Sequence, residues 1–139
     1  MKRSIGILMV LIMLGITGNA LNNPQGDKNN YVVSTTKILQ LQPIILTAEA
    51  LKKEDGTKYG DFQIVMYGSN VMELTDKEKM EAYTSKAKAA GVAISVCKIS
   101  LDRQGIDQSQ LHEYIQVVGH AYTHLIQRQK NKNYYSLQL

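Results

Sequence analysis

The feature that most constrains the fold is a regular alternation of β-prone and helical segments from Tyr31 to the end of the chain. Segments with helical periodicity separate five short apolar or alternating runs, at 31–33, 61–67, 92–96, 115–118 and 135–139. The run at 92–96 is nearly all apolar, as in a strand that is buried on both faces of its sheet. This pattern predicts an α/β domain with a doubly wound, mostly parallel five-stranded sheet and helices on both faces.

The predicted helices have recognisable ends. The first begins near Gln42, with Pro43 tolerated in its first turn, and Asp55-Gly56 closes it. Thr75 and Glu78 have the spacing of a capping box at the start of the second helix, and Gly91 supplies its C-terminal stop. A short helix over 98–104 and a longer one over about 120–130 complete the set.

The first twenty residues have the pattern of a secretory signal peptide. Lys2 and Arg3 precede an apolar run from 5 to 16, and Gly18-Asn19-Ala20 places small residues at a cleavage site. The apolar run is shorter than the roughly 20 residues that span a bilayer, although an uncleaved anchor is the alternative. We therefore expect cleavage after Ala20, export to the periplasm, and no membrane attachment after cleavage.

The remaining chain divides into a polar leader over 21–30, expected to be flexible, and one domain over 31–139. The net charge of the full chain is only +4, and its lysines are interspersed with acidic residues. That distribution is typical of a solvated surface and lacks the concentrated basic face of a nucleic-acid-binding protein. The turns after the first two strands lack the glycine spacing of nucleotide sites, so no cofactor is predicted.

Cys97, the only cysteine, lies where the third predicted strand ends and a helix begins. Backbone N–H groups at a helix start favour a thiolate, and Lys98 adds a neighbouring positive charge. Free cysteine is also among the most buried residues. The sequence therefore leaves three states open for Cys97: buried and inert, paired with another chain, or used chemically.

Two histidines follow the fourth predicted strand, and His120 lies at the same predicted edge of the sheet as Cys97. His120 and His124 are four residues apart, a spacing that metal ligands use, but the other ligands of a zinc site are missing. We therefore predict no metal. His120 is a candidate base for Cys97, with a solvent-facing histidine as the alternative. His112 falls in a polar loop, where no specific role is expected.

The segment Gly-Val-Ala-Ile-Ser-Val-Cys at 91–97, with the short helix and the Arg-Gln-Gly-Ile that follow, resembles the DsrE/DsrF-like (TusD-like, YchN-like) sulfur-relay family. The resemblance extends from Tyr31 to Leu139 and includes the helix at 46–51 and the strand-to-glycine turn at 65–68. It implies a five-stranded α/β domain that assembles into homotrimers or homohexamers. It also implies that Cys97 accepts sulfane sulfur as a persulfide and passes it to a partner protein.

Two functions follow from these expectations. The first is an exported sulfur carrier, or sulfurtransferase-like protein, that acts through Cys97 between a sulfur donor and an acceptor. The alternative is a non-catalytic oligomeric binding module in which Cys97 only packs. The carrier requires a thiol that is reachable and easily deprotonated, whereas the binding module requires only a small apolar volume.

Overall fold

The computed structural model describes residues 28–139, so the predicted signal peptide and most of the leader lie outside the described residues. Five strands form one sheet: β1 (Asn29–Thr35), β2 (Tyr59–Met66), β3 (Val92–Cys97), β4 (Gln116–Val118) and β5 (Tyr134–Gln138). Their order is β4-β3-β2-β1-β5, and every neighbouring pair is parallel. The predicted fold class is therefore confirmed.

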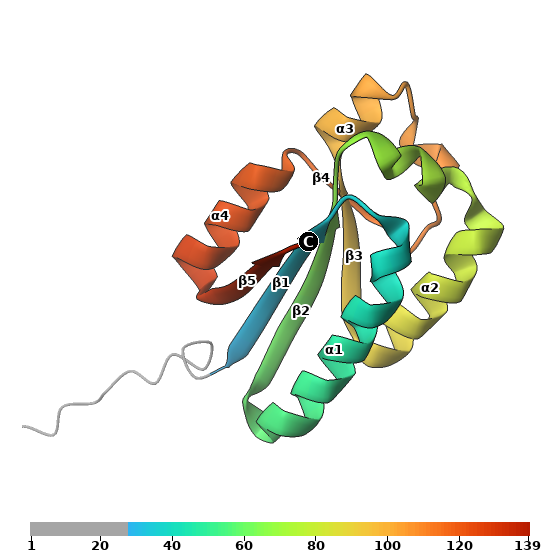
Figure 1. Cartoon of the computed structure of the whole chain (residues 1–139). Coiled ribbons are helices and arrows are strands. Elements are labelled where there is room, and N and C mark those ends of the chain that lie inside the picture. The colour runs from blue at the N-terminus through green and yellow to red at the C-terminus, as the bar shows by residue number, and fades with distance from the viewer. Residues whose placement is uncertain (1–27) are drawn as a thin grey trace, which may run out of the picture.

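Helices cover both faces of this sheet (Figure 1). The helices α1 (Leu41–Asp55) and α2 (Lys77–Ala90) lie on one face, α4 (Ala121–Lys132) lies on the other, and the short α3 (Lys98–Arg103) follows the carboxyl end of β3. Short 3-10 segments occur at Ile38–Gln40, Gly56–Lys58, Ser69–Thr75 and Gln108–Gln110. Within residues 28–139, no helix has both the length and the apolar character needed to cross a membrane.

The hydrophobic core is divided by the sheet into two clusters, because successive strand residues point to opposite faces. Val92, Ile94 and Val96 of β3 belong to the larger cluster, which packs against α1 and α2. The smaller cluster lies beneath α4 and consists of Val32, Val65, Cys97, Ala121 and Leu125. Burial on both faces explains the apolar sequence of β3, and it places the thiol on the α4 side.

Strand β1 begins at Asn29, two residues before the predicted start of the domain. The Asn29 amide donates to the Asp55 carboxylate at 2.9 Å, and the Asn30 side chain accepts from the Asp61 N–H at 2.9 Å. These contacts extend the strand into the segment that was expected to be flexible. The polar composition of the leader gave no indication of them, because their partners are distant in sequence.

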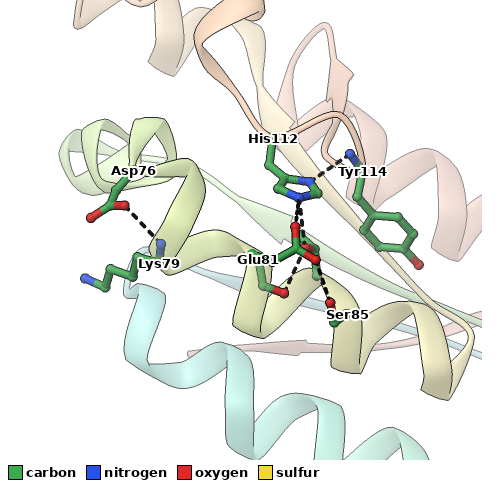
Figure 2. Close-up of polar contacts among 7 residues, drawn as sticks. Asp76, Lys79, Glu81, Ser85, His112 and Tyr114 are labelled. Atoms are coloured by element: carbon green, nitrogen blue, oxygen red, sulfur yellow. Dashed lines mark hydrogen bonds and ion pairs between the residues drawn. The ribbon is translucent and has the colours of Figure 1, made fainter.

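The predicted capping box at the start of α2 is wrong. Asp76 is the N-cap, and its carboxylate accepts from the Lys79 N–H at 3.0 Å (Figure 2). Thr75 belongs to the preceding 3-10 segment, where its hydroxyl donates to the Met72 carbonyl at 2.8 Å. Gly91 ends α2 as predicted, in the left-handed conformation with φ of 73°.

Candidate functional site

Cys97 is the last residue of β3 and the N-cap of α3, as the sequence predicts. Because β3 lies between β2 and β4, its carboxyl end is flanked by the loop after β2 and by the start of α4. The Cys97 side chain is 3% exposed. The thiol is thus enclosed by α3, which follows it directly, and by two segments that are distant in the sequence.

Hydrogen-bond donors surround the sulfur of Cys97. The Ala121 N–H donates to Sγ at 3.3 Å, from the first residue of α4. Burial raises the pKa of the thiol, but the N–H of Ala121, the N–H and hydroxyl of Ser100 and the N–H of Ile99 together lower the pKa below its ordinary value. The expected preference for thiolate at this strand end therefore has a structural basis.

Lys98 does not contribute to this environment in the way the sequence suggested. Its ammonium group binds both carboxylate oxygens of Asp102, at 2.8 and 3.0 Å, one helical turn further along α3. Both side chains of this ion pair are exposed, and the Asp102 carboxylate balances the positive charge of Lys98. The thiolate is stabilised by hydrogen-bond donors, and Lys98 is engaged elsewhere.

Ser100 is a member of the site that the sequence analysis missed. Its hydroxyl accepts a hydrogen bond from the Gly68 N–H at 3.0 Å, which fixes the hydroxyl where it helps to lower the pKa of the Cys97 thiol. Gly68 has φ of 88° and ψ of −163°, a region that is essentially restricted to glycine. The Cys-x-x-Ser spacing was the available signal, since it places the hydroxyl in the first turn of α3.

A cavity of about 200 Å³ opens beside the thiol. Its lining residues come from the loop after β2, from α3 and from the start of α4: Tyr67, Gly68, Cys97, Ile99, Ser100, Arg103, His120, Ala121 and Tyr122. Arg103 brings a positive charge to this cavity, and it forms no ion pair within residues 28–139. The space greatly exceeds the roughly 30 Å³ that one water molecule occupies in the liquid.

The structure brings His120 to the same cavity as Cys97, but as an exposed neighbour. Its Nδ1 pairs with the Thr123 hydroxyl at 2.9 Å, and its ring meets the Tyr122 ring edge-on at 5.2 Å between centroids. In the part of the chain that the structure describes, no hydrogen bond joins His120 to the sulfur. His120 therefore lines the approach to the thiol, and its ring is hydrogen-bonded to Thr123.

His124 belongs to the sheet-facing side of α4 and does not line that cavity. Its Nε2 pairs with Gln63 Oε1 at 2.9 Å, while burial and then the nearby Arg128 lower the pKa of its imidazole. The two histidines therefore have separate environments. Over residues 28–139, no three His, Cys, Asp or Glu side chains are placed to hold a metal ion.

His112 was expected to have no specific role, and that expectation is wrong (Figure 2). Its Nδ1 accepts from the Tyr114 N–H at 3.1 Å, so Nε2 carries the proton that is donated to the Glu81 carboxylate at 2.7 Å. This hydrogen bond is the main cause of the lowered pKa of Glu81. His112 therefore attaches the loop before β4 to α2.

The fold and this site define a doubly wound α/β protein with a cysteine at the carboxyl edge of its sheet. No protein-family model and no curated protein matches the sequence. A protein of unknown function from Methanobacterium thermoautotrophicum has a similar structure, with a TM-score of 0.65 and 19% identity over 80% of this chain and 100% of that chain. A conserved protein of unknown function from Bacteroides thetaiotaomicron gives a TM-score of 0.58 and 17% identity, over 82% and 96% respectively. At such identities the likeness shows the fold alone.

Proposed function

We propose that this protein is an exported sulfur carrier that holds sulfane sulfur on Cys97, in the manner of the DsrE/DsrF-like proteins that its sequence resembles. One observation carries the proposal. The Cys97 sulfur receives hydrogen bonds that favour thiolate, and it adjoins a cavity of about 200 Å³ that has room for an added sulfur atom.

The chemistry of loading is a thiolate exchange. The Cys97 thiolate attacks a sulfane sulfur of a polysulfide, a new S–S bond forms, and one S–S bond of the donor breaks. The shortened polysulfide leaves with the electron pair, so no separate oxidant is consumed. In the unloading step, an acceptor thiolate attacks the outer sulfur and Cys97 leaves as the thiolate.

Intact-mass measurement after exposure to inorganic polysulfide tests this proposal. We expect one added sulfur per chain, removed by a reductant and absent in Cys97→Ser. Thr84→Ser is a control for fold integrity, because Thr84 is a buried hydroxyl residue of α2 and does not line the cavity of Cys97. An unmodified wild-type protein whose thiol resists alkylation until the fold is denatured would contradict the carrier.

That contrary result would favour the second function, a binding module in which Cys97 packs. Its support is that Cys97 is 3% exposed and belongs to the apolar cluster beneath α4. A packing role tolerates Cys97→Ala apart from the loss of the hydrogen bond that the Ala121 N–H donates to the sulfur. The alkylation rate of the native protein therefore separates the two functions directly.

Assembly into a homotrimer or homohexamer belongs to the same proposal. The edge strand β5 supports it, because Tyr135, Leu137 and Leu139 expose 63%, 52% and 44% of their surface along the end of the chain. Tyr134, by contrast, is turned inward and donates its hydroxyl hydrogen bond to Asp61. Light scattering on the mature domain tests the assembly, and a monomer at high concentration would count against it.

Export is the remaining part of the proposal, and it depends on residues outside the described range. N-terminal sequencing of the native protein is expected to begin at Leu21, after cleavage at Ala20. A native chain that still starts at Met1 in the cytoplasm would refute it.

A further inference from the structure

The outer side of α4 combines exposed apolar and basic side chains. Tyr122 and Ile126 are 54% and 62% exposed, while Ala121 and Leu125 of the same helix are buried against the sheet. Tyr122, Ile126 and Lys130 follow one another at spacings of four residues, so they share one face of the helix. We call these three residues the outer face of α4.

The charged residues of α4 itself are all basic. From Tyr114 to the end of the chain there is no Asp or Glu, whereas Arg128, Lys130 and Lys132 all lie on α4. Elsewhere among the described residues, two lysines form ion pairs with carboxylates, Lys79 with Glu73 and Lys98 with Asp102. A basic helix without acidic residues favours an acidic partner and disfavours a basic one.

The Tyr122 ring on the outer face of α4 is fixed by packing against two other rings. The Tyr122 ring packs edge-on against Tyr67 at 5.5 Å and against His120 at 5.2 Å between centroids. A tyrosine that is fixed in this way and still half exposed has the properties of an interface anchor, since little conformational entropy is lost when it is covered. Tyr122 also lines the cavity of Cys97, so the surface is continuous with the approach to the thiol.

We propose that the outer face of α4 docks an acidic protein segment that covers Tyr122 and Ile126 with its own apolar side chains and pairs its carboxylates with Lys130 and the neighbouring basic residues. Charge complementarity selects this occupant. A second copy related by a two-fold axis through this face would set Arg128, Lys130 and Lys132 of both molecules against each other. A lipid surface requires a wider apolar face than α4 presents, because its other apolar residues are buried in the core.

This docking surface goes beyond the carrier function and does not require Cys97 to be reactive. Selection of random linear peptides displayed on phage, with the wild-type protein as bait, provides the probe. We expect the enriched peptides to carry net negative charge together with at least one large apolar residue. A synthetic peptide of the consensus sequence is then titrated by fluorescence anisotropy at low and at high salt.

The double variant Ile126→Ser with Lys130→Glu is expected to weaken binding of that peptide by about tenfold or more. Its matched control is Leu46→Ser with Lys53→Glu, which makes the same chemical changes on an exposed face of α1 and is expected to leave binding unchanged. Salt is expected to weaken binding to the wild type more than to the α4 variant. Polysulfide loading of Cys97 in the α4 variant is expected to equal that of the wild type.

Four results would overturn the proposal. Enriched peptides without acidic bias would remove the charge argument, and equal loss in both double variants would make the effect non-specific. If the wild type binds anionic phospholipid vesicles and only the α4 variant loses that binding, the surface is assigned to lipid. If the α4 variant loses the oligomer, the surface is assigned to a second copy of the chain. Failure of Cys97 loading in the wild type would refute the carrier function alone, since peptide binding is measured separately.

Discussion

Replacement of Gly68 by alanine tests the connection between the loop after β2 and the thiol. Gly68 has φ of 88° and ψ of −163°, a conformation that costs a residue with a side chain about 1–3 kcal/mol. An added Cβ also comes within 3.2 Å of the Thr36 side chain. If the backbone shifts to relieve these contacts, the hydrogen bond from the Gly68 N–H to Ser100 is lost, at a further cost of about 1 kcal/mol.

Gly91→Ala is the matched control for this substitution. Gly91 also has positive φ, at 73°, but it is in the ordinary left-handed region and an added Cβ would contact nothing within 4 Å. The left-handed conformation destabilises an alanine, but the unfolded chain of the variant is also more restricted, which offsets part of that cost. The net loss of stability on replacement is therefore expected to be about 1 kcal/mol. We therefore expect Gly68→Ala to lower the free energy of unfolding by about 2–3 kcal/mol, clearly more than Gly91→Ala.

Urea denaturation followed by circular dichroism gives the two free energies, and the pH dependence of Cys97 alkylation reports on the site. The midpoint of the alkylation profile is expected to move to higher pH in Gly68→Ala, because the Ser100 hydroxyl is no longer fixed where it lowers the pKa of the thiol. Gly91→Ala is expected to keep the wild-type midpoint. Equal destabilisation by the two variants, or an unchanged midpoint in Gly68→Ala, would refute the reasoning.

Other substitutions test the same contacts more locally. Ser100→Ala is expected to shift the Cys97 alkylation midpoint to higher pH, whereas Ser85→Ala on α2 leaves it unchanged; the same shift in both variants would exclude a local effect. Because the folded pKa of Cys97 is lowered, the free energy of unfolding is expected to rise as pH increases through the thiol range, and pH-dependent urea denaturation should show no such rise in Cys97→Ser. The lowered pKa of Glu81 contributes stability that is lost as pH falls through its folded value, so Glu81→Gln is expected to lose less stability on acidification, and an unchanged acid dependence would contradict the role of His112.

The features that the sequence predicted well are those encoded in neighbouring residues. The alternation from Tyr31 onward predicted the parallel sheet, and the apolar run at 92–96 predicted burial on both faces. Gly91 and Cys97 were placed at the ends of their elements, because a helix stop and a strand end are local events. Element boundaries differed by a few residues where a distant partner extended a strand, as Asp55 does for Asn29.

The features that the sequence missed depend on contacts across the fold. The Cys-x-x-Ser spacing brings Ser100 near Cys97, but its hydroxyl is fixed by the Gly68 N–H, which lies 32 residues away along the chain. Glu81 and His112 are 31 residues apart, and nothing local indicates that they meet. Thr75 had the right spacing for a capping box, yet the preceding 3-10 segment had already engaged its hydroxyl and left Asp76 to cap the helix.

Helix α4 connects the two proposals physically. Its first N–H group donates to the Cys97 sulfur, Leu125 closes the sheet face beneath it, and Tyr122 stands between the cavity and the outer face. A second sulfur on Cys97 would extend into the cavity that Tyr122 lines. In the loaded state a sulfur atom would therefore lie behind the exposed Tyr122 ring, and in the unloaded state it would be absent. A partner that covers Tyr122 would therefore contact a surface side chain that lines the cavity of Cys97, as the exposed Ile99 and His120 also do, without any movement of the sheet.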